Sequence, residues 1–315
     1  MAGQSVVFND FLFNERGTTT ALFQYAQYNE KILNNTSVIL VPKTADGFAV
    51  ELFKNNFQNV VFYDSQEELY SNCKNADLFY THVSGLKTSN EIDSIPCKTA
   101  VHCTFTAHDP HGNVYAAVSD WVAENYALQP VPTVPLITEL PDVDGDLRQE
   151  LGIPETAVVF GRYGGHDTFN ILVMMQTVAQ AVHQKEDIYF IFLNTAEFIK
   201  HERVIFLPKT FDIDRKVKFI NTCDAMIHAR REGETFGLSV AEFSLKEKPI
   251  ISWFWSHDRH HINCLGSHGL FYRSPRELFS TLTQFQKGTK AKDCYSERFN
   301  PENVMKTFES VFLSN

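Results

Sequence analysis

The 315-residue sequence has no long hydrophobic run, no CxxC pair among its six cysteines and no excess of positive charge. The apolar segment 171–175 is far shorter than the roughly 20 residues that cross a bilayer. No basic stretch followed by an apolar one opens the chain, so no secretion signal is expected. These absences argue against stable membrane insertion and against a disulfide or zinc framework. They predict a cytoplasmic protein whose cysteines are small buried hydrophobes.

The negative charge lies in the first half of the chain. Residues 1–150 hold 8 Lys and Arg against 19 Asp and Glu, a balance of −11, whereas residues 151–315 hold 20 against 19, a balance of +1. The overall charge of −10 argues against a nucleic acid as the main partner. An anionic small molecule is expected to prefer the second half.

Short β-rich runs alternate with helical patterns along the whole chain, which is typical of parallel α/β architecture. A proline-rich, acidic segment at 129–146 interrupts the pattern and is interpreted as a linker. The sequence therefore predicts two Rossmann-like, doubly wound domains facing a cleft, at 1–146 and 147–300. Segment 301–315 is expected to be a helix that packs back toward the first domain.

The expected elements of the first domain are strands at 5–8, 37–41, 60–63, 78–80 and 99–103, a candidate sixth strand at 116–119, and a helix at 18–33. Those of the second are strands at 157–161, 188–193, 204–207, 224–228, 249–253 and 268–272, with helices at 169–183, 235–245 and 275–285.

Two glutamates mark the most informative stretch, residues 224–252. Glu234 stands where a helix is expected to start, between Gly233 and Gly237, and free N–H groups at a helix start favour phosphate. Glu242 follows eight residues later, roughly 12 Å further along such a helix. That distance is about the span from a sugar ring to a ribose through a diphosphate. The simpler alternative is a strand-to-helix turn followed by a solvated glutamate.

Glu234, seven intervening residues, Glu242 and the Lys-Pro-Ile-Ile of 248–251 resemble the paired-glutamate (EX7E) motif of retaining GT-B glycosyltransferases. The resemblance implies that Glu234 contacts the donor sugar and Glu242 the ribose of the nucleotide. It also implies that the backbone amides after the first glutamate approach the sugar and phosphates, here those of Thr235, Phe236, Gly237 and Leu238.

A second stretch with this resemblance is 159–167, where Arg162 precedes Gly164 and Gly165 on a glycine-rich turn. An arginine there can form paired hydrogen bonds with a diphosphate and offset charge as the bond to the sugar breaks. Relatives usually carry a lysine shortly after this arginine, and this sequence does not. Arg230 or Arg231 is a candidate substitute. The alternative is that the two glycines form only a turn.

The first half contributes a loop and two histidines. Arg16, Gly17 and Thr18 follow the first expected strand, and relatives use this loop near the acceptor or the diphosphate. His108 and His111 follow the fifth strand, where many relatives place a histidine against the donor sugar. Their spacing does not select one of them. A plain turn, and a structural histidine, are the alternatives.

Metal sites are not expected. Both Asp-x-Asp pairs, 142–144 and 212–214, follow no clear buried strand and are interpreted as solvated. A group of four histidines lacks a carboxylate partner or a helical spacing and is interpreted as a loop lining the cleft: His257, His260, His261 and His268.

Together these features predict transfer of a sugar from a nucleotide-diphosphate sugar (UDP- or GDP-sugar) to a carbohydrate or glycoconjugate acceptor. The resemblance implies retention of the anomeric configuration, without a metal or other cofactor. Two alternatives stay open, namely a nucleotide-sugar epimerase on the same fold and a catalytically silent protein that binds carbohydrate or nucleotide sugar.

Overall fold

The computed structural model describes residues 3–11, 13, 17–45, 47–88, 91–210 and 212–314. The chain divides into two compact units. Unit 1 comprises Met1–Ile137 together with Arg298–Asn315, and unit 2 comprises Thr138–Glu297. Each unit is built around one six-stranded parallel sheet.

The sheet of unit 1 has the order β3-β2-β1-β4-β5-β6, and every neighbouring pair is parallel. Its strands are β1 (Ser5–Asn9), β2 (Thr36–Pro42), β3 (Val60–Tyr63), β4 (Leu78–Val83), β5 (Lys98–Cys103) and β6 (Val114–Ala117). All six expected strands exist, and the candidate sixth begins two residues earlier than predicted.

The helices of unit 1 are α1 (Gly17–Lys31), α2 (Gly47–Asn56), α3 (Gln66–Cys73), α4 (Asp120–Tyr126) and α12 (Pro301–Phe308), with short turns η1 (Ile92–Ser94) and η3 (Glu309–Leu313). Segment 301–313 is helical and packs within unit 1. Phe308 stacks on Phe8 and Tyr25 at ring distances of 6.4 and 5.2 Å. An aromatic cluster therefore fastens the C-terminal helix to β1 and α1.

The sheet of unit 2 has the order β14-β12-β10-β7-β8-β9, again parallel throughout. Its strands are β7 (Val158–Tyr163), β8 (Ile188–Leu193), β9 (Val204–Leu207), β10 (Ala225–His228), β12 (Ile250–Trp253) and β14 (Leu270–Tyr272). A separate two-stranded ladder joins β11 (Gly233–Glu234) to β13 (Asp258–Arg259).

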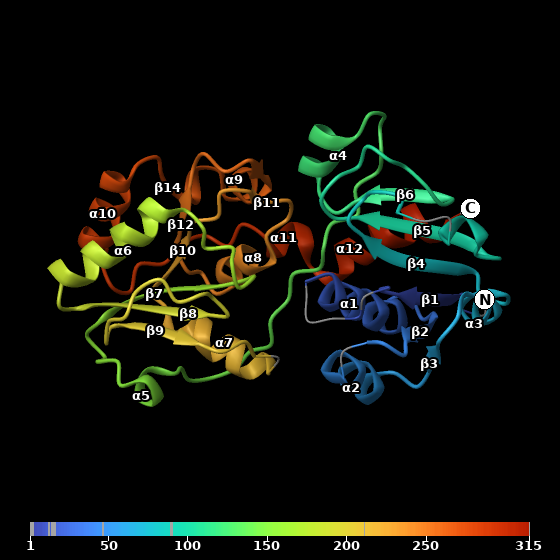
Figure 1. Ribbon diagram of the computed structural model, residues 1–315, viewed down its shortest axis with the longest axis horizontal. Helices are drawn as coiled ribbons and strands as arrows, with labels where there is room; N and C mark the ends of the chain where they lie inside the picture. Colours follow the sequence, from blue (N-terminus) through green and yellow to red (C-terminus); the bar gives the residue numbers. More distant parts are fainter. Residues whose placement is uncertain are drawn as a thin grey trace. The chain divides into compact units, whose positions relative to one another are not determined.

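Helices cover both faces of this sheet. The helices of unit 2 are α5 (Arg148–Leu151), α6 (Leu172–Gln184), α7 (Ile213–Thr222), α8 (Leu238–Leu245), α9 (His260–Leu265) and α10 (Pro275–Gln284), with the turn η2 (Gly266–His268). In α11 (Ser296–Phe299) the chain passes from unit 2 to unit 1. Figure 1 shows α6 beside α10, and both contribute to one core with Phe160 of β7. The preceding residue, Val159, is equally buried but faces the other way, because side chains alternate along a strand.

Several elements differ from the sequence prediction. Helices α2, α3, α4 and α7 were not expected. Helix α7 begins after Asp212, whose carboxylate accepts hydrogen bonds from the backbone N–H of Asp214 and Arg215. Capping of this kind explains an Asp-x-Asp pair without a metal. Among the described residues, no helix is long and apolar enough to cross a membrane.

Candidate functional site

The candidate site lies at the carboxyl ends of the parallel strands of unit 2, where open α/β sheets bind ligands. Two glycines shape the turn after β10. Gly233 (φ 76°) and Gly237 (φ 92°) adopt the left-handed conformation. A Cβ atom on Gly233 would lie 1.9 Å from the carbonyl oxygen of Asp258, so only glycine lets β11 approach β13.

These glycines also correct the predicted helix. Helix α8 begins at Leu238 with Gly237 at its N-cap, three residues later than expected. Glu234 belongs to β11 and does not stand at the helix terminus, and Thr235 and Phe236 lie between strand and helix. The estimate of roughly 12 Å between the two glutamates assumed one continuous helix from Glu234 to Glu242. Because the helix begins only at Leu238, that estimate does not apply.

Both carboxylate oxygens of Glu234 are held by neighbours. Oε1 lies 3.1 Å from Nε2 of His228, and Oε2 accepts a hydrogen bond of 2.9 Å from Nη1 of Arg230. Burial alone would raise the pKa of Glu234. The hydrogen bond with His228 and the charges of Arg230 and Arg162 outweigh burial, so the pKa lies below its ordinary value. Glu234 is therefore a carboxylate at neutral pH, with 17% of its side chain exposed.

Arg162, at the end of β7, folds back onto the loop that follows it. Its guanidinium donates to the carbonyl of Gly165 at 3.3 Å, to Oγ1 of Thr195 at 2.6 Å and to Oγ1 of Thr168. A Cβ atom on Gly164 would lie 2.6 Å from Nη2 of Arg162, which explains a glycine there. Burial lowers the pKa of Arg162 to about 10, so the group stays charged at neutral pH.

Two arginines were candidates to replace the missing lysine, and one of them, Arg230, is already paired with Glu234. Its guanidinium is one-quarter exposed and also lies 3.9 Å from Glu232. Arg231 is exposed, and its backbone N–H donates to Oδ1 of Asn170 at 2.9 Å. The positive charge nearest Glu234 therefore comes from Arg230 and Arg162.

Glu242 lies in α8 with 8% exposure, so it is not a solvated helix position. Its Oε1 accepts a hydrogen bond of 2.7 Å from Nζ of Lys216 in α7. Burial raises the pKa of Glu242 to about 8 and lowers that of Lys216 to about 8. The attraction between the two charges opposes both shifts, because each group stabilises the charged form of the other.

The surroundings of this pair are aromatic. Nζ of Lys216 lies 5.7 Å above the ring of Tyr163, which stacks on Phe243 at 5.9 Å. Oε2 of Glu242 and the hydroxyl of Tyr163 are buried, and among the described residues neither has a hydrogen-bond partner. Buried polar atoms without partners are rare in native proteins, so these two are candidate ligand contacts.

His228 and Lys216 were not predicted from the sequence as site residues. His228 ends the otherwise apolar strand β10 and is 2% exposed, and a polar residue at the carboxyl end of a buried strand is the signal that would have found it. Lys216 offered no such signal, because α7 itself was not expected.

The predicted loop of unit 1 is described in part. Arg16 lies outside the described residues. Gly17 and Thr18 are the first residues of α1, and the carbonyl of Thr18 lies 3.4 Å from Nδ1 of His82. Neighbouring Thr19 donates to Asp10 at 2.6 Å.

The two histidines of unit 1 differ in exposure. His108 is exposed, with Nδ1 beside the hydroxyl of Thr106. His111 is buried against Tyr115 at a ring distance of 5.4 Å, and its Nδ1 lies 2.8 Å from the carbonyl of Asp109. His108 is therefore the one with a solvent-facing imidazole.

No group of three His, Cys, Asp or Glu side chains within the described ranges is arranged to hold a metal ion. Asp142 is fully exposed, 3.5 Å from Lys246. The prediction that the four histidines lie in a loop is wrong for His260 and His261, which begin helix α9 and are buried at 4% and 0% exposure.

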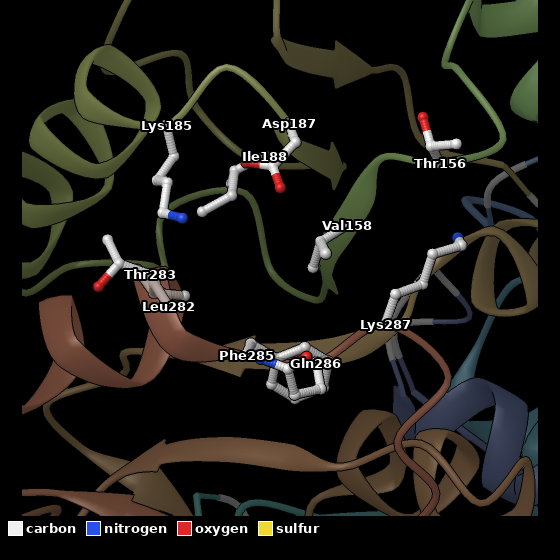
Figure 2. Close-up of a pocket in the computed structure, with 10 residues that line it drawn as sticks. All are labelled: Thr156, Val158, Lys185, Asp187, Ile188, Leu282, Thr283, Phe285, Gln286 and Lys287. Atoms are coloured by element: carbon white, nitrogen blue, oxygen red, sulfur yellow. The ribbon is translucent and has the colours of Figure 1, made fainter.

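A hollow of about 220 Å³ lies at the opposite edge of the unit 2 sheet, and Figure 2 shows the side chains that line it. It is lined by the first residues of two strands, Val158 and Ile188, and by Lys185 and Lys287. None of the predicted site residues lines it. Because parallel α/β sheets bind ligands at their carboxyl edge, the candidate site is at the turn after β10 and not in this hollow.

No family model matches the sequence, and no curated protein is similar to it in sequence. Solved structures, however, share its fold. HepE from Anabaena, determined with UDP and glucose, superposes with a TM-score of 0.76 over 99% of this chain and 100% of its own, at 15% identity.

Two further structures match over nearly their full lengths. A glycosyltransferase from Rickettsia africae has a TM-score of 0.65 at 12% identity, covering 99% of this chain and 95% of its own. A proposed UDP-N-acetylglucosamine 2-epimerase from Listeria monocytogenes has a TM-score of 0.61 at 13% identity, covering 100% and 98%. At these identities the likeness concerns the fold, and the predicted resemblance is confirmed at that level: the chain has the fold of the GT-B glycosyltransferases, with two parallel six-stranded α/β units.

Proposed function

We propose that this protein transfers a glycosyl group from a UDP- or GDP-sugar to a carbohydrate or glycoconjugate acceptor. The observation that carries the proposal is Glu234, a buried carboxylate held by His228 and Arg230 at the carboxyl edge of the unit 2 sheet. A fixed carboxylate is suited to accept hydrogen bonds from sugar hydroxyls. Support also comes from HepE, a protein of the same fold determined with UDP and glucose.

In the proposed reaction the anomeric configuration is retained. The bond from the anomeric carbon to the diphosphate breaks, the acceptor oxygen bonds to the same face, and the departing phosphate oxygen takes the acceptor proton. The protein supplies position and positive charge, from Arg162, Arg230 and the first amides of α8. The proposal includes no metal, and it includes a cytoplasmic location.

Epimerisation of a nucleotide sugar is the second candidate. It is favoured by the contact between Glu234 and His228, since a carboxylate beside an imidazole can pass a proton. A protein that binds nucleotide sugar without turnover is the third. A thermal-shift screen with UDP-, GDP- and ADP-sugars selects the donor, since ligand at 100 times its dissociation constant stabilises by about 2.7 kcal/mol. Product analysis with that donor, labelled in the sugar, then distinguishes transfer, an epimerised sugar and no reaction.

The two glutamates give the decisive test. Glu234→Gln is expected to lower turnover by about 10²–10³, the loss seen for one positioned transition-state contact, with little change in affinity for the nucleoside diphosphate. Glu242→Gln is expected to weaken that affinity by about 1.5–3 kcal/mol, the value of a charge-assisted hydrogen bond. Turnover with the donor and calorimetry with the nucleoside diphosphate supply the two measurements.

Glu247→Gln is the matched control, because Glu247 is an exposed glutamate paired with Lys290 just after α8. Circular dichroism establishes that all three variants are folded. If Glu234→Gln and Glu242→Gln both behave like Glu247→Gln, the assignment of roles to the two glutamates is wrong.

A further inference from the structure

Four side chains form a hydrogen-bond chain that runs inward from Glu234. Nε2 of His228 lies 3.1 Å from Oε1 of Glu234, and Nδ1 of His228 lies 3.0 Å from Oγ of Ser252. The same hydroxyl lies 3.2 Å from Nε2 of His261. The four residues come from β11, β10, β12 and α9, so the chain crosses the carboxyl edge of the sheet.

The charge of Glu234 sets the direction of every hydrogen bond in this chain. A carboxylate only accepts, so Nε2 of His228 must carry a proton, and when the ring holds that one proton only, Nδ1 is an acceptor. The hydroxyl of Ser252 must donate its single proton to that Nδ1. Ser252 can therefore only accept from His261, whose Nε2 must carry a proton. This leaves Nδ1 of His261 as a bare acceptor.

The row of hydrogen bonds ends at Nδ1 of His261. Nδ1 of His261 is buried, and in the described part of the chain it has no hydrogen-bond partner. A buried acceptor without a partner costs free energy, and a donor N–H in the same place would be left unsatisfied as well. Burial is the main reason that the pKa of His261 lies well below its ordinary value, and the nearby His228 is the second. The ring therefore stays neutral.

Ser252, His228 and Glu234 have the order of a nucleophilic Ser-His-carboxylate triad, but they do not work as one. Ser252 is 0% exposed, and its hydroxyl is committed to two histidines. No substrate carbon can reach it. Of the four hydrogen-bonded residues, Glu234 is the one whose side chain is partly exposed. The other three can therefore affect a ligand only through that carboxylate.

We infer that His228 is a positioning residue: it fixes the carboxylate of Glu234 through Nε2–H, and Ser252 and His261 lock it in the tautomer that allows this. The inference rests on the proposed function, in which Glu234 receives hydroxyls of the donor sugar. With Oε1 held by His228 and Oε2 by Arg230, the carboxylate cannot rotate. Its remaining lone pairs select a substrate that presents hydroxyl donors.

Two substitutions at His228 separate this role from general packing. His228→Gln places an amide N–H near the position of Nε2 and keeps the donor to Glu234, whereas His228→Asn reaches only the position of Nδ1 and loses it. We expect His228→Asn to lower kcat/KM about 10- to 100-fold, as for a lost hydrogen bond to a charge. We expect His228→Gln to stay within about threefold of the parent. Affinity for UDP or GDP should stay within about twofold in both.

The pH profile gives a readout that packing would not change. In His228→Asn the acidic limb of kcat/KM is expected to move to higher pH, because Glu234 loses the hydrogen bond that lowers its pKa. His228→Gln should keep the parent profile. Titratable or charged groups face this chain from several elements: Arg162 from β7, Arg230 from the turn after β10, Arg259 from β13, His260 from α9 and Tyr272 from β14.

The tautomers are tested without any substrate. Nuclear magnetic resonance of protein labelled with ¹⁵N-histidine is expected to show Nε2 protonated and Nδ1 bare in both His228 and His261. The resonances are assigned with His228→Gln and His261→Gln, and exposed His183 is replaced by Asn as the matched control. Should His228→Asn not fold, Ser252→Ala takes its place: it is expected to release His261 from its single tautomer, whereas Glu234 keeps Nε2 of His228 protonated.

An Nδ1–H tautomer in either ring overturns the inference, as does an equal loss of kcat/KM in His228→Gln and His228→Asn. If the parent protein has no transferase activity but both tautomers are as expected, the proposed function fails while the hydrogen-bond chain stands.

Discussion

Glu234 and Glu242 are eight residues apart in the sequence, and their surroundings differ in kind. Glu234 has a partner for each oxygen, His228 and Arg230, and its pKa is lowered. Glu242 has one partner, Lys216, and a second oxygen with no hydrogen bond among the described residues, and its pKa is raised to about 8.

Both side chains are largely buried, with 17% of Glu234 and 10% of Glu242 exposed, so burial alone does not separate them. The difference lies in how many donors and positive charges meet each carboxylate. Around Glu234 these outweigh the cost of removing charge from water. Around Glu242 a single lysine, itself buried, offsets only part of that cost. The comparison teaches that repeating a glutamate in a motif does not repeat its chemistry.

The largest effect is expected from removing Lys216. Lys216→Met removes the hydrogen-bond partner that Glu242 has among the described residues, and breaking a buried pair costs about 3–5 kcal/mol of unfolding free energy. Adding Glu242→Gln replaces the carboxyl group that is left without a partner, so the double variant is expected to be more stable than Lys216→Met alone. Urea unfolding at pH 7 measures both.

The control for this cycle is Lys290→Met, which breaks a pair of similar length, 2.6 Å, between exposed side chains. Exposed pairs contribute about 0–1 kcal/mol, so little change is expected. If Lys216→Met costs no more than Lys290→Met, Glu242 does not depend on Lys216, and the contrast between the glutamates is weaker than the contacts imply.

The next effect concerns the backbone beneath Glu234. Gly233→Ala forces a side chain into a left-handed conformation and against the carbonyl of Asp258, which is expected to cost about 2–4 kcal/mol. Turnover should fall more than affinity for the nucleoside diphosphate, because β11 carries Glu234 and not Glu242. Urea unfolding and the two functional assays measure these changes.

Gly152→Ala is the control that separates backbone strain from the steric clash at Gly233. Gly152 has a φ of 65°, but there is open space around it. About 1 kcal/mol is expected from the conformation alone. Equal losses in the two variants would show that the close contact between β11 and β13 contributes nothing.

The last effect is on the pH dependence of stability, and it has opposite signs at the two glutamates. The folded pKa of Glu242 is raised from the ordinary 4.5, so its stabilising contribution is present below that value and is lost as the pH rises toward about 8. The folded pKa of Glu234 is lowered, so its contribution is present above 4.5 and is lost as the pH falls through the folded pKa.

The measurement is the free energy of unfolding of the parent minus that of each Gln variant. Against Glu242→Gln this difference should fall between pH 5 and 8, by at most about 1.4 kcal/mol per pH unit. Against Glu234→Gln it should be flat there and fall only in acid. Slopes of the same sign would contradict the two environments described above.

Much of the fold was predictable from the sequence, since twelve runs of β-forming residues matched the strands of two parallel sheets. Buried strands were identified well, because each is a short apolar run between turns. Helix α7 was missed although Val217 and Ile220 lie on the apolar face of a clearly amphipathic helix. The start of α8 was misplaced because a sequence does not show which glycine takes a left-handed conformation.

By itself the sequence determined the two α/β units, the two glutamates and the glycines on either side of the first one, because strand patterns and glycine positions are local properties. Only the tertiary structure decided the state of each glutamate. His228 and Arg230 reach Glu234 through the turn after β10, and Lys216 reaches Glu242 from a neighbouring helix. Protonation depends on which charges lie within a few ångströms, and only folding brings those charges together.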